Sequence, residues 1–338
     1  MNNTTESFLE QELCSQIVSN KIRTTRIVVY TIVACATYFG NILILISLRK
    51  FSKQLKGTPY ILIGNLAVAD LLLAIGLTLQ ITGYIFKSLM GNAYFCVVKT
   101  CILAISLTAS GVLLMFISLD RFCAIVFPMK HLVLSTKCRR RRIRLTIIWV
   151  LSLAVICIPV ITNSNLSPGK STCNSCDMIS KRISLALAVF IPVQFIINVI
   201  MCLIVIWRLK TNTMSKRKYK KSMIKCGLLI RVYVAFAICW SPYVVTTFLI
   251  ETTNEKQKYL IVRQYTAILG LMNSAMNWII YGLSNMKLRD SFKNVLFCRH
   301  QRQLHFSNYI QAKSSDKREY KTATSGEVQP CETCETLA

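Results

Sequence analysis

The sequence predicts an all-α membrane protein, a bundle of seven transmembrane helices with an amphipathic eighth helix. Composition, long apolar runs and the placement of positive charge predict this fold class. Of the 338 residues, 53% are hydrophobic and 16% are charged, whereas a soluble domain carries about 25% charged residues. Because the apolar residues fall in long runs, we expect membrane spans rather than one globular core.

Seven apolar runs are long enough to cross a bilayer, which takes about 20 residues per helix. They lie near residues 26–48, 59–82, 95–123, 144–163, 183–209, 222–250 and 259–282. The chain then divides into four expected parts. These are an extracellular tail (1–25), a transmembrane domain (26–283), the amphipathic eighth helix (284–298) and a cytoplasmic tail (299–338). The first 20 residues are polar and acidic, so no cleavable signal peptide is expected.

Positive charge gathers on one side of this predicted bundle. The segments after spans one, three and five, together with the C-terminal tail, hold 29 of the 41 Lys and Arg residues. By the positive-inside rule that side is cytoplasmic, so the N-terminus lies outside and the number of spans is odd. We interpret the net charge of +27 as attraction to anionic membrane lipid rather than to nucleic acid. A multi-pass protein of the plasma membrane is expected.

Candidate modification sites occur on both predicted sides. Sequons for N-glycosylation occur at Asn2, Asn3 and Asn165, all on the outer side. On the cytoplasmic side, the segment 284–298 has Leu288, Phe292, Val295 and Leu296 at helical spacing and ends at Cys298. Such a helix lies in the membrane interface. Cys298 is then either a palmitoylation site or a free cytosolic thiol.

Span three connects the two membrane faces. Cys96 and Arg121 lie 25 residues apart, which is about 37 Å along a helix and slightly more than the thickness of the hydrocarbon layer. The cysteine therefore lies at the outer face, and Asp120 and Arg121 lie at the inner face. This adjacent pair can form a local ion pair that releases the arginine on activation, or Arg121 can simply extend to the headgroups.

Asp70 lies in the middle of span two, where a carboxylate is costly unless it is paired or hydrated. Polar residues that could share its site occur at mid-depth on spans one, three and seven. They are Asn41, Ser106, Ser110, Asn273, Ser274 and Asn277. The residue types alone leave two interpretations open, a small hard cation such as Na⁺ held with water, or a hydrogen-bonded polar core that fixes helix packing.

Span six contains a candidate hinge. Pro242 removes a backbone hydrogen bond, so the helix is expected to kink there and its cytoplasmic end can swing. Trp240 and Phe236, on the preceding turns, could connect the contents of a pocket to the bend. Aromatic side chains in a span more often serve packing alone.

Together these landmarks resemble the rhodopsin-like (class A) family of G-protein-coupled receptors, over roughly residues 26–298. Each motif is short, but their order and spacing match the family. The matching residues are Gly40-Asn41, Leu66-Ala67-Val68-Ala69-Asp70, Cys96, Asp120-Arg121-Phe122, Pro128, Trp149, Pro192, Phe236, Cys239-Trp240-Ser241-Pro242 and Asn277-Trp278-Ile279-Ile280-Tyr281.

The resemblance implies roles for individual residues. Arg121 would contact the G protein in the active state, and Tyr281 would rotate inward. Cys96 would bridge to the second outer loop, at Cys176 by preference or at Cys173. The family's allosteric sodium site would be formed by Asp70, Ser110, Asn273, Ser274 and Asn277. Arrestin and a receptor kinase would be further partners, and no cofactor is implied beyond the sodium ion.

The chain departs from the family pattern at several positions. Trp278 stands in place of a proline in span seven, and Gly111 in place of a bulkier residue in span three. At the inner end of span six, Ser222 stands where an acid would lock Arg121. Because the inactive state loses that pairing, we expect raised basal activity.

The ligand class stays open among a peptide, a lipid and a neutral small molecule. Leu103 and Leu271 stand where amine receptors and opsins of the family carry aspartate and lysine. Arg263, at the outer end of span seven, could pair with an acidic ligand. The candidate pocket residues are Gln80, Tyr84, Leu103, Leu107, Ser184, Tyr243, Thr247 and Arg263.

We therefore expect a receptor that binds an extracellular ligand and activates heterotrimeric G proteins through an outward swing of helix six. A non-signalling decoy receptor is the nearest alternative. A secondary transporter would show repeated halves or broken helices, and neither is visible. No enzyme is expected, because His131, His300 and His305 all lie in cytoplasmic segments and leave the spans without a reactive histidine.

Overall fold

The computed structural model describes residues 20–90, 92–127, 131, 138–161, 181–211, 216–253 and 256–297. Its described part contains seven long helices and two short ones, with no strand among the described residues. The long helices are α2 (Asn20–Lys50), α3 (Thr58–Ile85), α5 (Ala93–Val126), α7 (Cys138–Ile161), α9 (Lys181–Thr211), α10 (Lys216–Thr252) and α11 (Lys256–Ser284). The short ones are α4 (Lys87–Met90) and α12 (Met286–Leu296).

The predicted seven-helix fold is confirmed, and each apolar run falls on one long helix, apart from residues 162–163, which lie outside the described part. The helices extend beyond the runs; α10, for example, begins at Lys216, six residues before its run. Apolar sequence marks the hydrocarbon layer, whereas a helix continues into the polar interface. Among the described residues, five helices are long and apolar enough by themselves to span a membrane, namely α2, α3, α5, α9 and α10.

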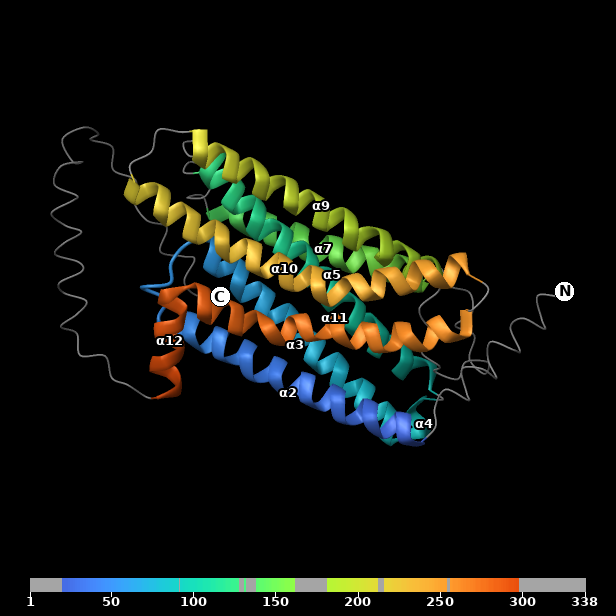
Figure 1. The fold of residues 1–338 in the computed structure, drawn as a ribbon. Helices are drawn as coiled ribbons and strands as arrows, with labels where there is room; N and C mark the ends of the chain where they lie inside the picture. Colours follow the sequence, from blue (N-terminus) through green and yellow to red (C-terminus); the bar gives the residue numbers. More distant parts are fainter. Residues whose placement is uncertain are drawn as a thin grey trace.

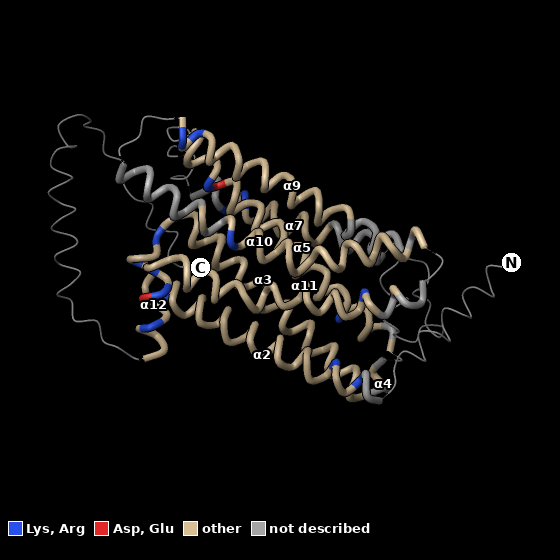
Figure 2. The backbone as a smooth tube through the Cα atoms, in the orientation of Figure 1, with Lys and Arg blue, Asp and Glu red and all other residues tan. Residues whose placement is uncertain are grey.

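The long helices lie side by side in one bundle, and α12 turns away across one end (Figure 1). We call the end that holds α12, Asp120 and Arg121 the inner end, and the opposite end the outer end. Helix α5 is central, because it contacts α3, α7, α9 and α10. Contacts of α10 with α11, and of α11 with α2, complete the bundle. Figure 2 shows that charged residues lie mostly near the two ends of the bundle.

The interior and the periphery differ as expected for a membrane bundle. Leu66, Leu73 and Leu113 are almost completely buried at the centre. By contrast, Leu203 and Trp207 on α9 are each 60% exposed, although both are strongly apolar. Such a surface is stable only against an apolar solvent, so these side chains face the lipid.

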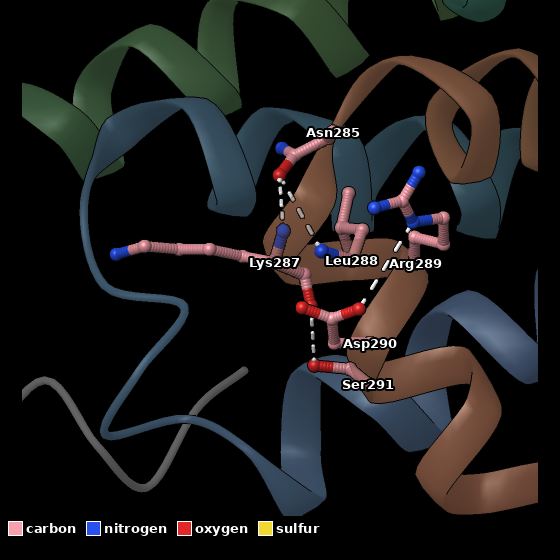
Figure 3. A network of polar contacts seen from close by, with 6 residues as sticks. All are labelled: Asn285, Lys287, Leu288, Arg289, Asp290 and Ser291. Carbon is pink, nitrogen blue, oxygen red and sulfur yellow. Dashed lines mark hydrogen bonds and ion pairs between the residues drawn. The ribbon is translucent and has the colours of Figure 1, made fainter. Parts of the chain in front are cut away.

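The short helix α12 begins at a side-chain cap. Asn285 accepts hydrogen bonds from the backbone N–H groups of Lys287, at 3.1 Å, and Leu288, at 3.4 Å (Figure 3). This satisfies two of the N–H groups left free at a helix start. Leu288 and Phe292 are buried against the bundle, whereas Leu296 is 48% exposed and points away from it. Val295 is partly buried against the same core, so three of the four predicted apolar residues pack on the bundle.

Candidate functional site

Asp70 is completely buried and is the centre of a polar cluster that joins three helices. On α5, the Ser110 hydroxyl donates to Asp70 Oδ1 at 2.9 Å. On α11, the Asn277 amide donates to Asp70 Oδ2 at 2.8 Å, and Ser274 is a further hydrogen-bond partner of the carboxylate. The structure thus brings together four of the five residues predicted for the sodium site.

The fifth residue, Asn273, is buried, and its Oδ1 atom has no hydrogen-bond partner among the described residues. The Oδ1 atoms of Asn41 and Asn277 are likewise buried and unpartnered there. The amide of Asn41 donates to the Thr37 carbonyl on its own helix at 2.9 Å, and to the Ser274 carbonyl on α11 at 3.4 Å. A carboxylate and amide oxygens are the ligand types that a small hard cation prefers.

Ser106 does not belong to this cluster. It is buried one turn outward from Ser110, and its hydroxyl donates to the carbonyls of Ile102 and Leu103 on its own helix, at 2.7 and 2.9 Å. Helical spacing alone put both serines on one face, whereas the family resemblance had already selected Ser110. Among the described residues there is also no group of three or more His, Cys, Asp or Glu side chains that could hold a transition metal.

Asp120 and Arg121 form the local pair that their adjacency predicts. Nη2 of Arg121 lies 3.7 Å from Oδ2 of Asp120, and the arginine side chain is 19% exposed. Sequence reasoning missed the third member, His131, whose Nε2 lies 3.0 Å from Asp120 Oδ1. Only the fold brings this histidine back onto α5, so the spacing of 11 residues carried no usable signal.

A second contact joins α5 to α10 near the inner end. Ser118 and Tyr233 are both buried, and the Ser118 hydroxyl donates to the tyrosine oxygen at 2.9 Å. Ser118 lies three residues before Arg121, so the bond lies about one turn outward from the arginine. This contact was not predicted, because neither residue belongs to a recognisable motif.

Aromatic side chains precede and follow Pro242 along α10. The Trp240 ring lies 6.3 Å from that of Phe236 and 5.7 Å from that of Tyr243, measured between ring centroids. On α11, a Cβ atom at Gly270 would lie 2.9 Å from three atoms of the Trp240 ring. The glycine therefore leaves room for the indole, and this close contact joins α10 to α11 at the depth of Trp240.

The two departures from the family pattern that the structure describes each have a packing partner. Trp278 fits against Gly40 of α2, where an added Cβ would lie 1.8 Å from the ring, and it meets Phe39 edge to face at 5.4 Å. Gly111 makes room for Gln194 of α9, whose amide donates to the Gly111 carbonyl. Each large side chain thus occupies the space beside a glycine on the neighbouring helix, which a larger residue there would fill.

The predicted pocket residues lie on the outer parts of α3, α5, α9, α10 and α11. Gln80, Tyr84, Tyr243 and Thr247 are buried, whereas Leu103, Leu107 and Arg263 are half-buried. Tyr84 stacks on Tyr30 of α2, with ring centroids 6.1 Å apart. The side chain of Ser184 is outside the described residues.

Sequence reasoning missed two buried cations in this outer region. Arg26 of α2 is 5% exposed and donates to Gln264 of α11, and Lys99 of α5 is 4% exposed. Each cation lies near the end of an otherwise apolar span, so the sequence alone does not indicate that its side chain is buried.

Several predicted sites lie wholly or partly outside the described residues. Cys96 is disulfide-bonded. Both candidate partners lie outside the described residues, so the choice between them stays a prediction. The glycosylation and palmitoylation sites are also outside. These residues are Asn2, Asn3, Asn165, Cys173, Cys176 and Cys298.

Comparison with known proteins agrees with this geometry. The model of the 7 transmembrane receptor (rhodopsin family) matches residues 40–281. Somatostatin receptor type 1 of Rattus norvegicus is 26% identical over 285 residues, which is 79% of this chain and 70% of the relative. Melatonin receptor type 1A of Phodopus sungorus is 27% identical over 285 residues (80% and 79%), and the Allatostatin-A receptor of Bombyx mori is 25% identical over 316 residues (88% and 85%). The chain therefore belongs to the rhodopsin family of seven-transmembrane receptors.

Proposed function

We propose that this receptor binds an extracellular ligand at the plasma membrane and activates heterotrimeric G proteins by an outward swing of the inner end of α10. The observation that carries the proposal is Arg121, a cation held by Asp120 at the inner end of the central helix. The charge distribution supports a cytoplasmic position for this end. A conformer that frees the arginine presents five N–H donors to a bound protein.

The contacts of α10 support the proposed movement. At its inner half, the helix is held to α5 through Tyr233 and Ser118. Near Pro242, Trp240 packs against Gly270 of α11. A ligand that displaces the ring cluster around Trp240 therefore acts on the same helix that carries the inner contact, and it shifts the population toward the swung-out state.

We also propose that Na⁺ binds at Asp70, with Ser110, Asn273, Ser274 and Asn277 as the surrounding oxygen donors. The unpartnered Oδ1 atoms of Asn273 and Asn277 support this assignment. When bound, the ion would supply the positive charge that a buried carboxylate requires. Because the donors come from α3, α5 and α11, an ion at this site favours the arrangement in which these helices are close together.

The ligand class is proposed from the relatives and the pocket together. By their names, the relatives given above are receptors for somatostatin, melatonin and allatostatin-A. The outer region of this chain adds the buried cations Arg26 and Lys99 to the predicted Arg263. Together these positive charges make the outer region electropositive, which suits a peptide or small molecule with an acidic group better than an amine. Arrestin and a receptor kinase remain proposed partners through the C-terminal tail.

The test is nucleotide exchange on purified Gα subunits with βγ, using the receptor reconstituted in vesicles without added ligand. We expect exchange above that of receptor-free vesicles for at least one Gα class, and its loss in Arg121→Ala. Arg49→Ala is the matched control, because it removes an exposed arginine at the inner end of α2. If no Gα class responds to the wild-type receptor, the expected basal activity is wrong. A ligand screen in the same assay then decides the proposal, and the decoy alternative replaces it if no ligand produces exchange.

A further inference from the structure

Arg231 is a cation on the lipid-facing side of a membrane span. The apolar part of α10 runs from Ile230 to Ile250, so Arg231 lies just inside it, and the side chain is exposed. Val234 and Ile238, three and seven residues further on, are 50% and 63% exposed, which places all three on one face of the helix. A charged group on such a face is costly unless it reaches a polar partner.

The guanidinium is directed toward the inner end of the bundle. Nη2 of Arg231 lies 3.8 Å from the position of a Cβ atom added to Gly227. Gly227 lies one turn earlier on α10, about 6 Å closer to the inner end. The arginine therefore lies along the helix toward the headgroup layer, beside a residue that has no side chain to compete for the space.

No acidic residue of the described part is positioned to neutralise it. That part carries four acids, Asp70, Asp120, Glu251 and Asp290. Asp70 is bonded in the core, Asp120 is paired with Arg121 and His131, and Asp290 lies 4.0 Å from Arg289 on α12. Glu251 lies 20 residues along α10, about 30 Å away at the outer end.

The surroundings favour a ligand that has an anionic head and an apolar tail. The first turns of α10 carry six further cations, Lys216, Arg217, Lys218, Lys220, Lys221 and Lys225. Beyond Arg231, the same face continues as exposed apolar surface through Val234 and Ile238. In the orientation that charge predicts, this is the level of the inner leaflet, where anionic phospholipids are concentrated.

We propose that Arg231 binds the phosphate of an anionic phospholipid of the inner leaflet, whose acyl chain lies along Val234 and Ile238. The guanidinium provides paired N–H donors that match phosphate oxygens. The basic start of α10 favours a headgroup with net negative charge over a zwitterionic one. The site lies on the helix proposed to move in activation, but its existence does not depend on signalling.

Native mass spectrometry of the full-length receptor in detergent, titrated with phosphatidylserine and phosphatidylcholine, tests this proposal. We expect Arg231→Gln to weaken phosphatidylserine binding about fivefold, in line with the contribution of one basic residue near an anionic surface. Arg231→Lys should retain most of the binding. The matched control Lys53→Gln removes an exposed cation of the inner end that is not on α10, and it should have no such effect.

Two results would overturn the proposal. The first is an equal loss of phosphatidylserine binding in Arg231→Gln and Lys53→Gln, which would show general attraction to the basic end. The second is full competition by glycerophosphoserine, which lacks acyl chains. That result would show that the site binds only the anionic headgroup. Equal thermal unfolding of the variants shows that the comparison is between folded receptors. No G protein is present, so this outcome is separate from that of the exchange assay.

Discussion

The hydroxyl of Ser118 on α5 donates a 2.9 Å hydrogen bond to the phenolic oxygen of Tyr233 on α10. Both residues are buried, at 2% and 4% exposure. The chain has Ser222 where an acid on this helix would pair with Arg121. The neutral hydrogen bond, about one turn outward from Arg121, holds α5 and α10 together in the inner half of the bundle. We infer that it performs part of the task of the missing ion pair.

Tyr233→Phe should raise ligand-free nucleotide exchange about threefold to tenfold, because a buried hydrogen bond contributes about 0.5–1.5 kcal/mol to the state that contains it. Ser118→Ala should act in the same direction. The double variant should resemble the single ones, since both remove one bond. Tyr94→Phe, at a residue 82% exposed at the outer end, is the control. Fully additive effects of the two single variants would contradict a shared bond.

Asp70→Asn should abolish stabilisation of the receptor by sodium. For the wild-type receptor, we expect the unfolding temperature in NaCl to be about 2–4 °C higher than in choline chloride at equal ionic strength. A bound ion that stabilises the folded state by about 1.4 kcal/mol would produce a shift of this size. Ser110→Ala should reduce the shift, whereas Ser106→Ala should leave it unchanged, because Ser106 bonds only to its own helix. An equal sodium effect in Asp70→Asn would identify the cluster as a packing network alone.

Gly40→Ala should destabilise the receptor by about 1–3 kcal/mol, because its Cβ would lie 1.8 Å from the Trp278 ring and force the indole to move. Combination with Trp278→Ala should relieve most of this cost. Thermal unfolding of the wild type, the two single variants and the double variant measures the effect as a double-mutant cycle. Gly64→Ala is the control, since its Cβ would meet only the tip of Leu48, at 3.2 Å. Independent effects of Gly40→Ala and Trp278→Ala would refute the coupling.

His131→Ala should lower the free energy of unfolding by about 1–3 kcal/mol, because the buried Asp120 Oδ1 atom loses its 3.0 Å partner. It should also change ligand-free nucleotide exchange, since Arg121 then becomes the main partner of the carboxylate. Both quantities are measured on the same preparation. His305→Ala, in the C-terminal tail, is the control, and the prediction is wrong if the two variants behave alike.

The amino-acid sequence determined the bundle and most of the polar core. Apolar runs of bilayer length require helices, because lipid offers no partner for free backbone groups. The family motifs then predicted the group around Asp70 and the pair of Asp120 with Arg121. These residues could be predicted because each lies at a characteristic place along its own helix, or next to its partner in the chain.

Only the tertiary structure decided the contacts that depend on how the helices are rotated against one another. Helical spacing puts Ser106 and Ser110 on one face and the family resemblance selected Ser110, but only the structure shows that Ser110 reaches Asp70 whereas Ser106 bonds to its own helix. The partners of Ser118 and Trp278 lie 115 and 238 residues away. Side-chain volume and helix rotation select such partners, because a glycine accommodates a ring only where two helices approach closely, and helical periodicity within one segment carries no information about its neighbour.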